Sequence, residues 1–159
     1  VGERGRGLQA LRGTLDVERV LSAAISLGIG HGALDLALRY VGEREAFGGP
    51  IGRFQAVQHP LAESAAALTA ASLLVEHAAR SIDNGKPASP ESAMAKLVAS
   101  ECVGRLVDRA SRAMGAMGMA EEGSMQRYVR DARLQFFSPV NNELVRSIIS
   151  QSLGLPRSY

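Results

Sequence analysis

The chain has 159 residues, 46% of them hydrophobic, 21% charged and 4% aromatic, and its 18 basic and 16 acidic side chains nearly balance. This composition excludes a disordered chain, and the single Cys102 excludes a fold built on disulfides. No basic segment interleaved with aromatic residues exists to hold nucleic acid, and no uninterrupted apolar run is long enough to span a membrane or to serve as a secretory signal. We therefore expect one soluble, cytoplasmic domain with no nucleic-acid or membrane partner.

The start of the chain differs in composition from the rest. Residues 1–13 are rich in Gly and Arg and contain no initiator Met, so we expect an irregular leading segment of a longer protein. Residues 14–159 are expected to form the domain. From residue 15 to residue 44 the apolar residues recur at steps of three and four, and Thr14 or Asp16 has a side chain suited to capping. This pattern predicts one long helix.

Residues 45–53 contain three glycines and a proline and predict a loop. Further helical patterns follow, and we expect helices over residues 54–82, 89–114, 125–136 and 141–153. Ser89, Pro90 and Glu91 form the clearest start signal, with Ser89 as the N-cap and Pro90 at the first helical position. Because short connections make successive helices antiparallel, the expected fold is all-α: an up-down-up-down four-helix bundle with additional C-terminal helices.

Several motifs along this pattern resemble those of one known family, the flavin-dependent acyl-CoA dehydrogenases, in their C-terminal helical domain. The most specific is residues 44–55, REAFGGPIGRFQ, which is similar to the family pattern Arg-x-x-Phe-Gly-x-x-Ile-x-x-x-Gln. The other motifs, in the family's order, are residues 1–7, 15–19, 95–96, 115–119 and 130–133. The resemblance covers almost the whole chain, and it implies that residues 1–13 lead from the family's middle β-domain.

The resemblance implies an activity for the complete protein. Members of the family α,β-dehydrogenate an acyl-CoA thioester to the trans-2-enoyl-CoA, and their reduced FAD passes electrons to an electron-transferring flavoprotein. They serve pathways such as fatty acid metabolism and assemble as homodimers or homotetramers through this bundle. In this domain alone we expect no activity, since the family builds much of its site from other domains.

The resemblance also implies two sets of FAD contacts. In the first, Arg44 and Gln55 belong to the element that would reach the adenosine pyrophosphate. Phe47 and Phe54 would form apolar walls for the adenine end. The alternative is that Arg44 is a solvated cation at a helix end. In the second set, Gly115 and Ala116 would let the backbone approach the cofactor, and Arg112 stands where the family has Gln. A simple helix ending explains these glycines equally well.

The catalytic base departs from the usual family pattern. Most members carry it in a Glu-Gly-Thr motif, and counting forward from Arg130 brings the Glu position to Pro139, which cannot accept a proton. A minority branch, the isovaleryl- and long-chain-type enzymes, places its base at the start of the first helix, where this chain has Glu18. A helix N-terminus and the adjacent Arg19 are expected to keep Glu18 ionised, so both are predicted catalytic residues. The alternative is that Glu18 only stabilises the helix end.

Three alternatives stay open. Glu143 lies near the missing base and would replace it only if the backbone shifted. The loss of Glu-Gly-Thr also suits a non-catalytic partner subunit of a hetero-oligomeric dehydrogenase, kept for assembly and cofactor binding. A third alternative, an unrelated helical interaction module, remains if the motifs match the family by chance.

The histidines and the cysteine have simpler expected roles. His31, His59 and His77 have no neighbours at ligand spacing, so no metal site is expected, and Cys102 is predicted to pack as a small apolar residue.

Overall fold

The computed structural model describes residues 2–86 and 88–156. Val1 and residues 157–159, at the ends of the two expected segments, lie outside the described residues. Within them the chain is helical apart from loops and one isolated β-bridge between Glu45 and Pro50. The helices are α1 (Gly7–Glu43), α2 (Gln55–Asp83), α3 (Ser89–Met114), α4 (Met125–Leu134) and α5 (Asn142–Ser152), with 3-10 turns η1 (Ile51–Arg53) and η2 (Gly115–Gly118).

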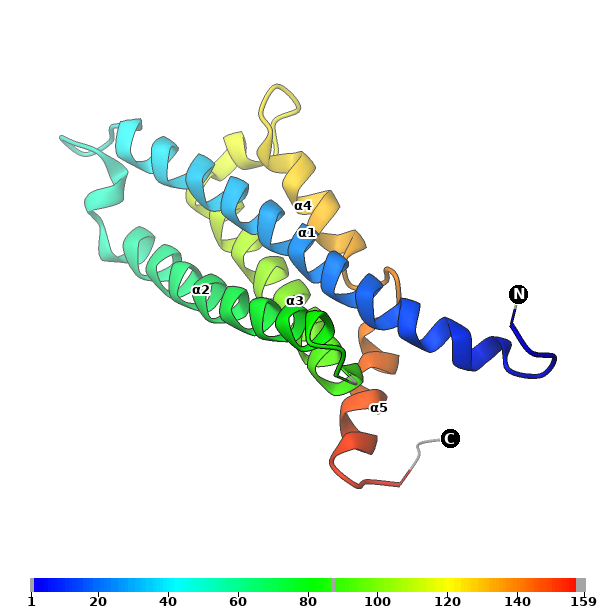
Figure 1. The fold of residues 1–159 in the computed structure, drawn as a ribbon. Coiled ribbons are helices and arrows are strands. Elements are labelled where there is room, and N and C mark those ends of the chain that lie inside the picture. The colour runs from blue at the N-terminus through cyan, green and yellow to red at the C-terminus, as the bar shows by residue number, and fades with distance from the viewer. Residues whose placement is uncertain (1, 87, 157–159) are drawn as a thin grey trace.

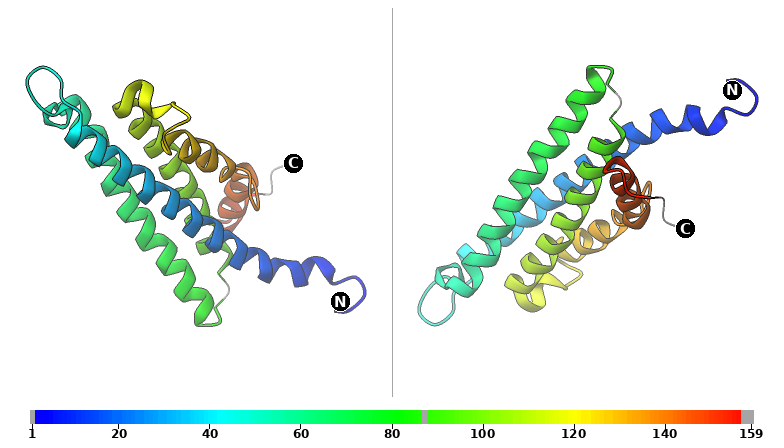
Figure 2. Two further views of the ribbon diagram at one scale, coloured as in Figure 1. Left: turned by 90° about the horizontal axis from the view of Figure 1, so that it is seen from above. Right: turned by 90° about the horizontal axis from the view of Figure 1, so that it is seen from below.

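The arrangement confirms the expected bundle. Helices α1 to α4 run alternately up and down, and α3 contacts α1, α2, α4 and α5. Helix α5 turns away across the end of the bundle at which α3 begins (Figure 1). The first turns of α1 project beyond the bundle at that same end (Figure 2). The loops that join α1 to α2 and α3 to α4 therefore both lie at the opposite end, apart from each other (Figure 1).

The core is built mainly from small residues, which let the helix axes approach closely. Alanines, valines and leucines of α1, α2 and α3 fill it, together with Met125 and Ala132 of α4. Gly30 of α1 marks a close approach, because a Cβ there would lie 2.8 Å from Val103 Cγ2 and 2.9 Å from Leu68 Cδ1. Close packing of α1 onto α2 and α3 thus requires Gly30.

Two expected helix starts are wrong. Helix α1 begins at Gly7 rather than near residue 15, so residues 7–13 are helical and not irregular. The run from Leu8 to Arg12 consists of strong helix formers, which outweighs its flanking glycines. The N-cap of α3 is Ala88, and Ser89 is already helical. Its hydroxyl accepts a hydrogen bond from Arg19 Nη1 at 3.4 Å, so it serves contact with α1 and does not cap the helix.

Helix α1 is unusually apolar. Thr14–Glu43 is long and apolar enough to cross a membrane by length and composition alone. It packs in the bundle against α2, α3 and α4, so a core position accounts for this composition as well.

Candidate functional site

The structure separates Glu18 from Arg19. Glu18 is exposed, whereas Arg19 is only 4% exposed and points into the bundle. Neighbouring residues of a helix project about 100° apart, so they do not face each other. Because α1 begins at Gly7, Glu18 also lies well inside the helix, beyond the turn where the helix dipole acts. Glu18 therefore has neither of the two expected neighbours, the Arg19 guanidinium and a helix N-terminus, and its role as the base stays a prediction.

Arg19 joins α1 to the first turn of α3. Its Nη1 lies 2.6 Å from Asp16 Oδ1 and donates to Ser92 Oγ at 3.1 Å. The Ser92 hydroxyl in turn lies 3.1 Å from the same Asp16 oxygen. These contacts give Arg19 a place in the packing of the two helices, and they pair it with Asp16 instead of Glu18.

A second contact of α1 brings the missing-base position close to Glu18. Ser22 is one helical turn beyond Glu18, and its Oγ lies 3.0 Å from the carbonyl oxygen of Ser138 and 3.1 Å from Gln135 Oε1. Since a hydroxyl has one hydrogen, it donates to one of these acceptors at a time. Pro139 follows Ser138 directly, so the segment of α1 that carries Glu18 contacts the α4–α5 turn that carries Pro139.

A buried lysine forms hydrogen bonds to both ends of the α4–α5 turn. Lys96 of α3 is fully buried, and its Nζ donates to Asn142 Oδ1 at 2.5 Å and to the carbonyl oxygen of Phe136 at 3.4 Å. Asn142 Nδ2 donates to Ser100 Oγ at 3.1 Å. Burial lowers the pKa of Lys96 from 10.5 to about 8; Glu143 opposes that shift, Arg146 adds to it, and Glu101 opposes it more weakly.

The lowered pKa makes folding depend on pH. Between pH 8 and 10.5 the unfolded chain binds the Lys96 proton more fully than the folded chain does, so stability rises with pH. We expect Lys96 to add up to about 3 kcal/mol to the rise in unfolding free energy over this window. Urea denaturation of the chain and of Lys96→Met at several pH values measures the difference, and equal slopes would contradict this assignment.

The α1–α2 loop forms a compact projection that carries the first predicted FAD set. Phe47 is 88% exposed in the left-handed backbone region, with φ 54°, and its ring lies edge-on to Phe54 at 6.1 Å. Arg53 supports this shape, because its guanidinium donates to the carbonyls of Phe47 and Gly48 and lies 5.0 Å from the Phe54 ring centroid. Gln55 is the exposed first residue of α2.

Arg44 ends α1 at the base of this loop. Its amide donates to the Tyr40 carbonyl at 2.8 Å and its carbonyl accepts from Ile51 at 2.8 Å, so its backbone is held. Its side chain is exposed, and no described residue forms an ion pair with it. The guanidinium is therefore available to an anion.

The second predicted FAD set lies where α3 ends. Gly115 is the C-cap, with φ 61°, and Ala116 is exposed in η2. Arg112 is exposed, and its Nε lies 3.0 Å from Asp108 Oδ2. A guanidinium has five donors, so this pair leaves others free for a ligand. The turn is open on the Gly115 side, where nothing lies within 4 Å of a built Cβ.

The two FAD sets share one end of the bundle but do not touch. The loop with Arg44 and Phe47 packs on α1 and α2, while η2 packs on α3 and α4. Figure 1 shows both at the end opposite to α5. The turn with Pro139 lies toward the other end, beside Ser22. The predicted residues thus form three separate places on this domain, so any complete cofactor site includes further protein surface.

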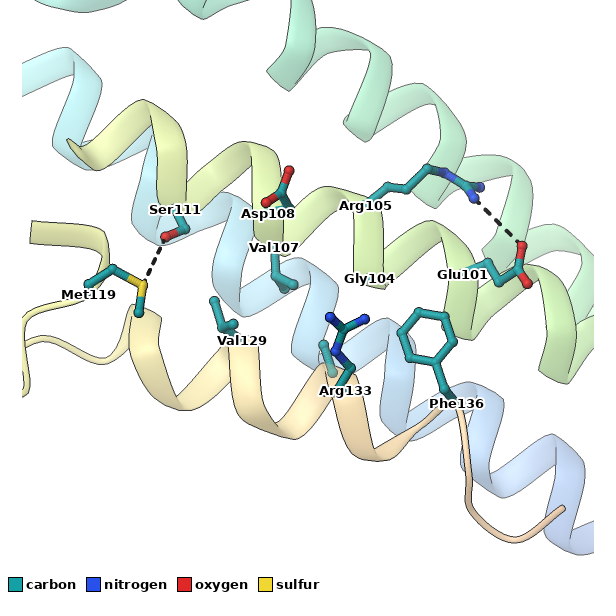
Figure 3. A pocket seen from close by; sticks show the side chains of 11 residues that line it. Glu101, Gly104, Arg105, Val107, Asp108, Ser111, Met119, Val129, Arg133 and Phe136 are labelled. Atoms are coloured by element: carbon teal, nitrogen blue, oxygen red, sulfur yellow. Dashed lines mark hydrogen bonds and ion pairs between the residues drawn. The ribbon is translucent and has the colours of Figure 1, made fainter. Parts of the chain in front are cut away.

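A groove with a volume of about 470 Å³ lies between α3 and α4. In Figure 3 the side chains of Arg133 and Phe136 extend into it from α4 and the turn that follows, and Arg133 lies over the Phe136 ring with 5.7 Å to the centroid. Gly104 forms the opposite wall and admits the ring, because a Cβ there would lie 2.5 Å from Phe136 Cζ. No predicted site residue lines this groove.

The remaining candidates have simple roles. Within the described residues no group of His, Cys, Asp and Glu is arranged to hold a metal ion. Cys102 is buried in the core as predicted, and burial raises the pKa of its thiol. Glu143 is exposed at the start of α5, where it lies 3.7 Å from Arg146.

Sequence reasoning missed the residues that hold these places in position. Ser22 was not singled out, Asn142 was noted only as lying near the missing base position, and Arg53 and Lys96 were noted only as parts of motifs. A lysine among the apolar residues of a helix face was the available signal, because such a group needs buried partners. The contacts of Ser22 with Ser138 and of Asn142 with Lys96 carried no signal, since the partners lie far apart in the sequence.

Comparisons with known proteins agree with this architecture. Residues 5–154 match the family model "Acyl-CoA dehydrogenase, C-terminal domain". Benzylmalonyl-CoA dehydrogenase of Aromatoleum aromaticum is 40% identical over 152 residues, which are 96% of this chain and 40% of that protein. The mitochondrial short-chain specific acyl-CoA dehydrogenase of Rattus norvegicus is 41% identical over 159 residues, covering 100% of this chain and 38% of the relative.

Solved structures give the same result. Butyryl-CoA dehydrogenase from Megasphaera elsdenii superposes with a TM-score of 0.95 at 34% identity, covering 97% of this chain and 40% of that chain. An FAD complex of PigA superposes with a TM-score of 0.93 at 26% identity, covering 98% of this chain and 40% of that chain. The chain spans about two fifths of the length of the curated relatives that it matches. By sequence and by fold, it belongs to the acyl-CoA dehydrogenase family and corresponds to that family's C-terminal domain.

Proposed function

We propose that this chain is the C-terminal domain of an FAD-dependent dehydrogenase that converts an acyl-CoA thioester to the trans-2-enoyl-CoA, and that Glu18 is its catalytic base. The observation that carries the assignment of Glu18 is the contact of Ser22 with the Ser138 carbonyl. Ser22 lies one helical turn beyond Glu18, and Ser138 directly precedes Pro139, the position at which most of the family has its glutamate. This contact supports the proposal that an acid on α1 serves the same reacting carbon.

The chemistry requires a carboxylate at this place. A proton on the carbon beside a thioester is only weakly acidic, so it is removed by a positioned base as the β-hydrogen leaves. FAD, when bound, accepts that hydrogen as a hydride. Leu21 and Ile25 share the exposed face of α1 with Glu18 and are both 57% exposed. This face offers an apolar acyl chain a surface next to the base.

The two loop regions fit the cofactor. Arg44 presents an unpaired planar cation, which suits a pyrophosphate, and the exposed Phe47 ring suits an adenine. The open turn at Gly115 gives a second surface of small residues, beside Arg112. Because the two regions do not meet within one chain, we propose that each serves a different cofactor across a subunit interface.

The Arg44 assignment gives a direct test of cofactor binding. In the full-length protein, Arg44→Gln is expected to weaken FAD binding by about tenfold to a hundredfold, the cost of one charged hydrogen bond. Fluorescence titration of the flavin-free protein with FAD measures this change. Arg39→Gln is the control, since Arg39 is also exposed on α1 and has no ion pair among the described residues. Equal affinities of the two variants would refute the contact.

Assembly and electron transfer follow from the same proposal. Ala62, Ala66 and Ala70 form an exposed small-residue stripe on α2, and we propose this face as the contact of a homodimer or homotetramer. The electron acceptor would be an electron-transferring flavoprotein.

The acyl group of the substrate stays open. Benzylmalonyl-CoA dehydrogenase and the short-chain specific enzyme act on different acyl-CoA thioesters according to their names, so similarity to them does not select the acyl group.

Two departures from the family pattern favour a second candidate function. Pro139 occupies the usual base position and Arg112, at the usual Gln position, is engaged by Asp108. A non-catalytic partner subunit of a hetero-oligomeric dehydrogenase would tolerate both changes. Such a subunit would bind FAD without needing Glu18.

Product analysis tests the proposed function. The full-length protein is incubated with single acyl-CoA thioesters and an electron-transferring flavoprotein, and the products are analysed by mass spectrometry. Loss of two hydrogen atoms from one thioester, giving the trans-2-enoyl-CoA, is the expected result. Unchanged thioesters across short, branched and aromatic acyl groups would reject catalysis by this subunit.

A further inference from the structure

We propose that Lys96 is a positioning residue for this reaction. It holds the turn of residues 136–142 against the bundle, so that Ser138 and Pro139 keep their place against α1, one helical turn from Glu18. The inference rests on the proposed function, because it concerns the same site. Lys96 does not reach that surface itself, since it is fully buried in α3. Its effect must pass through the turn.

The contacts of Lys96 close the base of the turn. The amide of Asn142 donates to the Phe136 carbonyl at 3.0 Å, which joins the two ends of the turn. Lys96 Nζ donates to that same carbonyl at 3.4 Å and to Asn142 Oδ1 at 2.5 Å. A single cation thus binds both ends, and Ser100 holds the other side of the Asn142 amide.

The turn is also fixed on its other sides. The Phe136 ring packs over Gly104, where no side chain would fit. The Ser138 carbonyl is held by Ser22 of α1, at 3.0 Å. With its base on α3 and its middle on α1, the turn has one defined position relative to Glu18. Among the residues described as holding this turn, Lys96 is the charged one.

The absence of a directly paired acid makes this anchor sensitive to its surroundings. No carboxylate in the described residues lies within 4.0 Å of Lys96 Nζ, and the charged groups that act on it are Glu143 and Arg146 of α5 and Glu101 of α3. Glu101 and Glu143 are themselves paired with Arg146. A neutral amine keeps N–H donors but loses the charge that strengthens both hydrogen bonds. The two hydrogen bonds that hold the turn therefore weaken when Lys96 loses its proton, although removal of the buried charge stabilises the fold as a whole.

Two variants separate positioning from a merely structural role. In the full-length protein, Lys96→Met is expected to lower kcat for the acyl-CoA by about tenfold to a hundredfold, the effect of a small displacement at a site. Thermal stability near pH 7 should fall only modestly, because the two oxygens that lose Lys96 still accept hydrogen bonds from Ser100 Oγ and from the Asn142 amide. Lys86→Met is the control, since Lys86 is the other lysine and is exposed; its kcat should be unchanged.

Asn142→Asp provides the complementary test. It places a carboxylate 2.5 Å from Lys96 Nζ, if the side chain keeps its position, and so holds the amine charged to higher pH. The expected result is near-normal kcat with the alkaline fall of the pH–rate profile moved to higher pH. A profile with the alkaline limb unmoved would overturn the proposal, and so would normal kcat in Lys96→Met.

Hydrogen exchange of this 159-residue chain gives a readout that does not depend on catalysis. Lys96→Met should speed exchange of the amides of residues 136–142 by about tenfold or more, while the core amides of α3 stay protected. Exchange unchanged in this turn would overturn the proposal. If the wild-type protein reduces no flavin with any thioester, the proposed function fails, and the exchange result still decides whether Lys96 holds the turn.

Discussion

Replacing Glu18 by Gln in the full-length protein is expected to lower the rate of flavin reduction by acyl-CoA by about a hundredfold to ten-thousandfold, the usual contribution of a general base. Gln matches Glu in size but cannot accept a proton. Because Glu18 is exposed and lies outside the buried Arg19 network, the variant should fold and keep its FAD. Stopped-flow absorbance under anaerobic conditions measures the rate.

Glu143→Gln is the matched control for this experiment. Glu143 is the other acid near the turn, but it is exposed on α5 beside Arg146. Its replacement should leave the rate of flavin reduction nearly unchanged. A normal rate in Glu18→Gln would instead support the non-catalytic subunit or a different base, and a large loss in Glu143→Gln alone would identify that base.

Replacing Gly118 by Ala is expected to cost about 2–3 kcal/mol of unfolding free energy, within the range for overfilling a packed site. A Cβ at Gly118 would lie 2.3 Å from the backbone oxygen of Ser111 and 2.7 Å from its Oγ. The obstacle is the backbone of α3 itself, which cannot rotate away as a side chain can. Urea denaturation of the 159-residue chain measures the loss.

Gly123→Ala controls for the general effect of replacing a glycine. A Cβ at Gly123 would meet its nearest neighbours, two carbonyl oxygens, at 3.5 Å, an ordinary contact. Its stability should stay within about 0.5 kcal/mol of the starting protein. A stable Gly118→Ala chain would show that η2 can move away from α3, and would weaken the second FAD surface as a fixed feature.

The sequence predicted the bundle because its signals were local. Apolar residues at steps of three and four marked each long helix, and the glycines of residues 48–52 and 115–118 marked the breaks. The predicted start of α1 was wrong because Gly7 and Gly13 suggested an irregular segment, although the residues between them are strong helix formers. That error also gave Glu18 a place near a helix end that it does not have.

The candidate site could be predicted only where a motif carried it. Arg44, Phe47 and Gly115 belong to motifs and lie exposed at turns, as a cofactor surface requires. Arg19 shows the limit, because adjacency to Glu18 in sequence suggested a pair that helix geometry forbids. The contacts of Ser22 with Ser138 and of Lys96 with Asn142 join residues far apart in the chain, so only the fold reveals them.

The most direct test of the whole account is an absorbance titration of the full-length protein with acyl-CoA thioesters under anaerobic conditions. The purified protein should show the spectrum of oxidised flavin, and one thioester should bleach that band. Bleaching would show at once that the protein binds a flavin and that the thioester reduces it. A protein that binds no flavin, or whose flavin no thioester reduces, would contradict the assignment of this chain to an active acyl-CoA dehydrogenase.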